Sequence, residues 1–156
     1  MRLTTFTDYT LRTLIYVALR PGTLTTISDI AEAYNISSNH LMKVVHQLGQ
    51  AGDVITLRGQ HGGVRLARPP SEIIIGEVVR RTEPDLQIVP CFADGCNCAI
   101  RTDCKLGNAL NSALDAFLAV LDNCTLADLI TGDSGLTHVL GIEAPVPVPV
   151  PVPVPA

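Results

Sequence analysis

The chain has no cysteine in its first ninety residues, although it has five in all. No run of about eighteen apolar residues occurs, so we expect no membrane-spanning helix and no membrane partner. Residues 1–8 lack the apolar core and the small-residue cleavage site of a signal peptide. We therefore expect a cytoplasmic protein. Thiols stay reduced there, so clustered cysteines indicate metal or redox chemistry rather than a disulfide framework.

The sequence patterns of enzymes are also missing. No nucleophile–base pair, phosphate-binding loop or cofactor fingerprint stands out, so we expect a protein that is not an enzyme. Charged residues make up only 17% of the chain, against 47% hydrophobic residues. This balance allows a real core within one domain and predicts that some apolar surface is buried between subunits.

The formal net charge of −4 is unevenly divided along the chain. Residues 1–83 hold nine Lys and Arg against seven Asp and Glu, whereas residues 84–156 hold two against eight. Between positions 38 and 68, Asp53 is the one acidic residue among four basic ones, which are Lys43, Arg58, Arg65 and Arg68. A local positive surface of this kind is the footprint expected of a DNA-binding domain.

Hydrophobic periodicity and turn residues predict a mainly α fold with one small β-hairpin wing, an α+β arrangement. Helices are expected at about 7–20, 28–34, 37–50, 71–81 and 104–122, with a short turn at 125–130; Thr7 or Asp8 is expected to cap the first. Asn35 suits the tight turn before the third helix, because asparagine tolerates the left-handed conformation. Two β-prone segments between 54 and 67 flank a glycine-rich loop. This order predicts a winged helix-turn-helix followed by a long dimerisation helix.

The chain therefore divides into four parts. Residues 1–83 form the DNA-binding domain, 84–103 a metal-binding loop, 104–130 the dimerisation helix and 131–156 a C-terminal tail. A Pro-Val repeat from Ala144 predicts that the tail is extended and disordered, because alternate residues lack an amide donor. The long helix is expected to cross its twin in a homodimer through a wide apolar face, made of Leu106, Leu110, Ala113, Leu114, Phe117, Leu118 and Leu121.

The third helix and the hairpin supply the residues expected to contact DNA. Polar and basic side chains on the outer face of the helix can contact base edges or phosphates: Ser38, Asn39, His40 and Lys43, with His46 and Gln47 also facing outward. Side chains on or beside the wing suit the DNA backbone or the minor groove: Arg58, Gln60, His61 and Arg65. Polar residues alone would indicate only a solvated surface. The wing, the local positive charge and the three-helix order together favour a double-stranded DNA operator as the partner.

Four of the five cysteines, Cys91, Cys96, Cys98 and Cys104, lie within fourteen residues. Thiolates gathered this densely favour a soft metal centre such as an iron–sulfur cluster. Either Cys96 or Cys98 can be the middle ligand between the outer two. A structural zinc site that uses all four is the alternative, although the Cys96–Cys98 spacing is tighter than zinc sites commonly show. Cys124 indicates a buried structural thiol.

Several sequence blocks resemble the iron–sulfur winged-helix repressors over about residues 1–130. They are MRLT at 1–4, FTDY at 6–9, ISSNHLMKVV at 36–45, LRG at 57–59, GG at 62–63 and LA at 66–67. The resemblance implies a homodimer that holds a 2Fe–2S or 4Fe–4S cluster through three cysteines. Five residues separate the last two, and a Leu follows shortly after, as Leu106 does here. This pattern implies Cys91, Cys98 and Cys104, with Cys96 as the alternative. The fourth ligand that it implies is Asp8, donated by the partner subunit.

The regulator of cluster assembly in this family carries a histidine three residues after its last cysteine, where this chain has Gly107. The difference favours a sensor of nitric oxide. The resemblance then implies that nitric oxide releases the protein from DNA and derepresses the genes for nitric-oxide detoxification. A sensor of iron availability or cluster status is the alternative with the same fold. A metal-storage or electron-transfer protein is the alternative from another class, and the wing and the positive surface argue against it.

Overall fold

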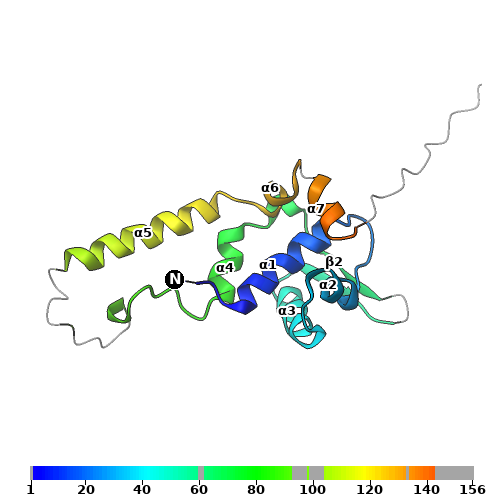
Figure 1. The fold of residues 1–156 in the computed structure, drawn as a ribbon, viewed down its shortest axis with the longest axis horizontal. Helices are drawn as coiled ribbons and strands as arrows, with labels where there is room; N and C mark the ends of the chain where they lie inside the picture. Colours follow the sequence, from blue (N-terminus) through cyan, green and yellow to red (C-terminus); the bar gives the residue numbers. More distant parts are fainter. Residues whose placement is uncertain (1, 60–61, 93–97, 99–103, 133, 143–156) are drawn as a thin grey trace, which may run out of the picture.

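The structure is a computed structural model that describes residues 2–59, 62–92, 98, 104–132 and 134–142. Most helices pack together with a two-stranded hairpin at one edge of the group, and one long helix, α5 (Lys105–Asp122), projects away from them (Figure 1). The other elements are α1 (Thr5–Ala18), α2 (Ile27–Tyr34), α3 (Ser38–Gln50), β1 (Val54–Leu57), β2 (Gly63–Leu66), η1 (Pro70–Glu72), α4 (Ile75–Thr82), η2 (Pro90–Phe92), α6 (Leu126–Ile130) and α7 (Ser134–Val139). The predicted fold class, mainly helical with a small β-hairpin, is confirmed. No helix of the described residues is long and apolar enough to cross a membrane.

Helix α1 begins earlier than the sequence pattern predicts. Its N-cap is Thr4, whose hydroxyl accepts a hydrogen bond from the backbone N–H of Thr7 at 3.2 Å. Thr7 itself is buried, and its hydroxyl donates to Thr82 Oγ1 on α4 at 2.9 Å. Asp8 lies in the first turn of the helix. The predicted cap at Thr7 or Asp8 is therefore wrong, because a contact with α4 occupies the Thr7 side chain.

The helix-turn-helix follows from local signals. Thr26 and Asp29 form a reciprocal capping box at the start of α2, with N–H to oxygen distances of 2.9 and 3.1 Å. Asn35 ends α2 in the left-handed conformation with φ of 52°, as predicted for this turn. Helix α3 then packs one apolar face against the core, through Leu41, Val44, Val45 and Leu48. Its opposite face is left to solvent.

Strands β1 and β2 pair antiparallel, with Val54 opposite Leu66 and Leu57 opposite Gly63. Thr25, in the turn before α2, adds two backbone hydrogen bonds to Val64, of 2.8 and 2.9 Å. The base of the wing is thereby joined to the helix-turn-helix. The tip of the hairpin, residues 60 and 61, lies outside the described residues.

Two expectations for the second half differ from the structure. The helix predicted at 71–81 starts only at Ile75, because Ile74 is extended and forms an antiparallel bridge with Thr125. Residues 134–139, assigned to the tail, form α7, and Ile142 beyond it is only 7% exposed. This stretch packs on the folded part because it still carries apolar side chains. The Pro-Val repeat lies outside the described residues.

Candidate DNA-reading surface and metal centre

The outer face of α3 carries the predicted DNA contacts. Ser38, Asn39, His40 and Lys43 are all exposed, on the side opposite the buried apolar face of the helix. The ring of His40 lies beside that of Tyr9 on α1, with centroids 6.1 Å apart. Short polar side chains at the N-terminal end of such a helix can reach base edges in the major groove.

The wing adds two exposed cations. Arg58 follows β1 and Arg65 lies on β2, and both are exposed. Together with Lys43 they take part in no ion pair within the described residues. The predicted wing residues Gln60 and His61 lie outside the described residues. Unpaired cations on the helix and the wing suit contact with phosphates.

Two residues that the sequence placed on this surface serve a structural role instead. Arg68 donates through Nη2 to the fully buried carboxylate of Asp53 at 2.7 Å, and Arg81 on α4 binds the other carboxylate oxygen. Gln47 donates through Nε2 to the backbone carbonyl of Arg81 at 3.2 Å. Arg68 therefore does not belong to the positive surface, because the buried carboxylate of Asp53 neutralises its charge.

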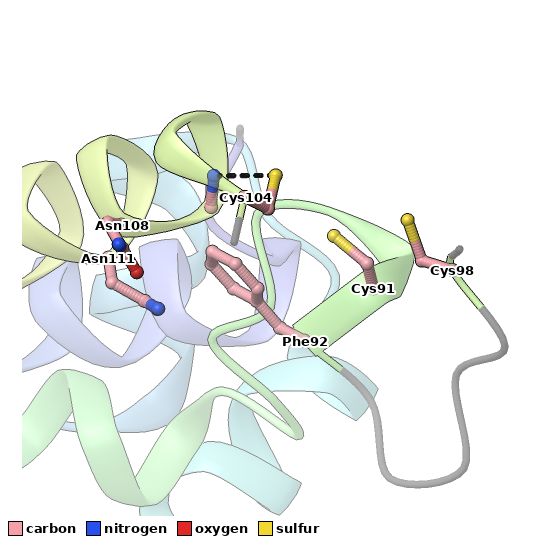
Figure 2. A pocket seen from close by; sticks show the side chains of 7 residues that line it. Cys91, Phe92, Cys98, Cys104, Asn108 and Asn111 are labelled. Atoms are coloured by element: carbon pink, nitrogen blue, oxygen red, sulfur yellow. Dashed lines mark hydrogen bonds between the residues drawn. The ribbon is translucent and has the colours of Figure 1, made fainter. Parts of the chain in front are cut away.

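A pocket of about 250 Å³ brings together the three predicted cysteine ligands. Cys91 lies in η2 and Cys98 in the following loop, whereas Cys104 immediately precedes α5. Figure 2 shows the sulfur atoms of Cys91 and Cys98 pointing the same way, beside Cys104. The alternative ligand Cys96 lies outside the described residues. Cys124 is half-buried beyond the far end of α5 and does not line the pocket.

The start of α5 forms one wall of this pocket. Cys104 is the N-cap of the helix, and its Sγ accepts a hydrogen bond from the backbone N–H of Gly107 at 3.3 Å. Helix N-termini favour negatively charged groups such as a metal-bound thiolate. Asn108 and Asn111 also line the pocket, with Phe92 from η2. Sequence reasoning missed these three side chains. For Asn108 and Asn111 a signal existed, because the spacing of positions 104, 108 and 111 places them with Cys104 on one face of the helix.

The donor set of the pocket fits an iron–sulfur cluster, because cysteine thiolates are the usual protein ligands of such clusters. Among the residues that the structure describes, no three His, Cys, Asp or Glu side chains lie close enough to hold a single metal ion. A cluster is larger than an ion, so its ligands lie further apart. Asp8 does not line the pocket of its own protomer, and its carboxylate oxygens lie 3.0 Å from Arg12 Nε. Its assignment as a ligand for the partner subunit stays a prediction.

Helix α5 carries no buried residue, and its apolar side chains Leu106 and Val120 are 67% and 69% exposed. Near its C-terminal end, Leu121 packs against the core. A solitary helix of this length is marginal in water, and its stability usually comes from packing of an apolar face. The protomer therefore presents a long, largely exposed apolar surface along α5.

A helix-turn-helix with a polar outer face, followed by a wing with exposed cations, defines a winged-helix transcriptional regulator. The Rrf2 family model, described as iron-dependent transcriptional regulator, matches residues 3–132. The chain belongs to the Rrf2 family. This confirms the resemblance drawn from the sequence blocks and identifies a DNA-binding regulator rather than an enzyme.

Curated relatives support the same class. The chain is 53% identical to the HTH-type transcriptional regulator NsrR of Bacillus subtilis (strain 168), over 90% of this chain and 97% of that protein. NsrR of Geobacillus kaustophilus is 49% identical with the same coverage. Among solved structures, CymR, the global cysteine regulator of B. subtilis, has a TM-score of 0.67 and 27% identity, over 84% of this chain and 97% of that one.

Proposed function

We propose that this chain is an iron–sulfur repressor that senses nitric oxide. One observation carries the proposal: Cys91, Cys98 and Cys104, from two separate elements and the loop between them, line one pocket at the N-terminus of α5. When bound there, the cluster supplies iron that reacts with nitric oxide. The cysteines bind it and thereby tie the segment that follows α4 to the start of α5.

The proposal places a second copy of the chain on the apolar face of α5. In a twofold dimer both subunits contribute the same surface to the interface. The leucine face of α5 in one protomer would therefore pack against the same face in its partner. The exposed length of α5 in the protomer supports this choice of partner. Asp8 of the partner subunit would then complete the ligand set, in place of its pairing with Arg12.

In such a dimer the two α3 helices and wings would meet successive half-sites of one operator. The bound cysteines would fix the angle between α5 and the DNA-binding domain, and the dimer would fix the distance between the two DNA-reading surfaces. Loss of the hold that Cys91, Cys98 and Cys104 provide would let the two reading surfaces lose their register, and affinity for the operator would then fall. Repression of nitric-oxide detoxification genes would then end.

The test uses protein purified without oxygen and a DNA duplex that the protein itself selects from random sequences. The expected result is iron and sulfide in the purified protein, visible absorbance, and loss of duplex binding on titration with nitric oxide. Zinc without sulfide would indicate the structural-zinc alternative. A reversible redox potential without DNA binding would indicate electron transfer.

Single cysteine variants locate the cluster. Cys98→Ala should remove the visible absorbance and the tight binding of the selected duplex while leaving a folded protein. Cys124→Ala is the matched control, because this thiol does not line the pocket. A Cys98→Ala protein that still binds tightly and responds to nitric oxide would contradict the ligand assignment.

A further inference from the structure

The end of α5 that lies far from the cysteines is joined tightly to α4. Asp122, the last residue of α5, accepts hydrogen bonds from both terminal nitrogens of Arg80, one of them 2.7 Å long. This bonding by Arg80 lowers the pKa of Asp122 below its ordinary value, so the pair is charged at neutral pH. A two-pronged contact of this kind sets orientation as well as distance.

Close packing reinforces this contact. Gly76 on α4 faces Asp122 so closely that a Cβ atom there would overlap the Asp122 carboxylate. Just beyond α5, Ile75 N donates to Cys124 O and Leu126 N donates to Ile73 O, each at 2.9 Å. We call the contact of Gly76, Arg80 and Asp122, with these backbone bonds, the α4–α5 joint. It leaves little freedom for α5 to change its angle to α4.

Another face of α4 contacts the DNA-reading elements. Arg81, next to Arg80, binds the buried Asp53 in the turn between α3 and β1, and Arg68 after β2 binds the same carboxylate. Gln47 of α3 donates to the Arg81 carbonyl. Consecutive residues of a helix point about 100° apart, so one arginine faces α5 and the next faces the base of the wing.

We propose that Arg80 and Asp122 are positioning residues, which carry a change in the direction of α5 through α4 to α3 and the wing. The inference rests on the proposed function, because it supplies the structural route from the cysteine pocket to the DNA-reading surface. The 18 residues of α5 span about 27 Å at 1.5 Å per residue. A sideways shift of about 2 Å at Cys104 therefore rotates α5 by about 4° about its C-terminal end. If the α4–α5 joint is rigid, α4 rotates by the same angle.

The pair suits a test because it does little for folding. The side chains of Arg80 and Asp122 are 42% and 39% exposed, and exposed ion pairs contribute little to stability. Asp122→Asn should therefore give a folded protein that keeps its oligomeric state and its visible absorbance. Gly76→Ala disturbs the same joint without a change of charge. Asp115→Asn is the matched control, since Asp115 is exposed on α5 and has no ion pair among the described residues.

The measured quantity is the coupling factor, the ratio of the selected-duplex dissociation constants of cluster-free and cluster-loaded protein. We expect Asp122→Asn and Gly76→Ala each to reduce this factor by roughly threefold to tenfold, through weaker binding by the loaded form alone. Asp115→Asn should leave it unchanged. Wild-type coupling in both joint variants would overturn the proposal.

A spectroscopic measurement separates this inference from the proposed function. Coupling is reciprocal, so the duplex should raise the concentration of iron chelator needed to bleach wild-type protein. In Asp122→Asn the duplex should raise this chelator concentration much less. A residue that only stabilised the fold would not change the effect of the duplex on the cluster. If wild-type protein binds the duplex equally with and without its cluster, and the duplex does not protect the cluster from the chelator, the proposed function fails, and the proposal for the joint fails with it. If wild-type protein shows both effects and the two joint variants show them equally, only the proposal for Arg80 and Asp122 is refuted.

Discussion

Asp53 offers a sharp test of how the reading surface is held. Its carboxylate is fully buried between α3, the wing and α4, and binds Arg68 and Arg81. Asp53→Asn keeps the size of the side chain, removes its charge and places an amide N–H₂ against a guanidinium. The remaining amide oxygen can still accept from one arginine, but both arginines lose the buried negative charge that neutralises them.

The expected cost follows from burial. Removal of one partner from a buried ion pair destabilises proteins by about 3–5 kcal/mol. The side chains of Arg68 and Arg81 are 30% and 31% exposed, so water can partly solvate them. We therefore expect a loss at the lower end, about 3 kcal/mol of the free energy of unfolding. For a chain of this size that corresponds to a fall in Tm of about 6–12 °C.

Urea denaturation of the cluster-free protein, followed by circular dichroism, measures this loss directly. Asp115→Asn makes the same chemical change at an exposed site and should stay within about 0.5 kcal/mol of wild type. Asp53→Asn should also bind the selected duplex more weakly, because the wing is no longer held against α3. A loss below about 1 kcal/mol, with normal DNA binding, would refute the account of this triad.

Three further predictions follow from single side chains. Lys43→Ala should weaken binding to all DNA sequences and lower the slope of log affinity against log salt by about one; an unchanged slope would remove Lys43 from the interface. Leu114→Asp should give a monomer in sedimentation experiments, because it places a charge in the leucine face of α5. Burial raises the pKa of Tyr34 to about 12, above its ordinary 10.0. Stability should therefore fall as pH rises from about 10 to 12, and in Tyr34→Phe this fall should shrink in alkaline unfolding experiments.

Sequence patterns predicted much of the DNA-binding domain because its elements depend on local chemistry. The buried face of α3, the turn at Asn35 and the hairpin follow from side-chain spacing and backbone preference, and all were found as expected. The three cysteines were likewise predicted to lie together, and they line one pocket. Their role as ligands came from a family resemblance and remains a proposal.

The chain by itself therefore determined where most helices lie, which face of α3 is buried and which residue types gather in the cysteine loop, because these depend on neighbours in sequence. Tertiary structure alone decided that Arg68 belongs to a buried ion triad rather than to the positive surface. It also decided that Ile74 is extended rather than helical, and that Asp122 and Arg80 meet. Those outcomes depend on partners more than 14 residues away along the chain, and charge or periodicity in a short window carries no information about such partners.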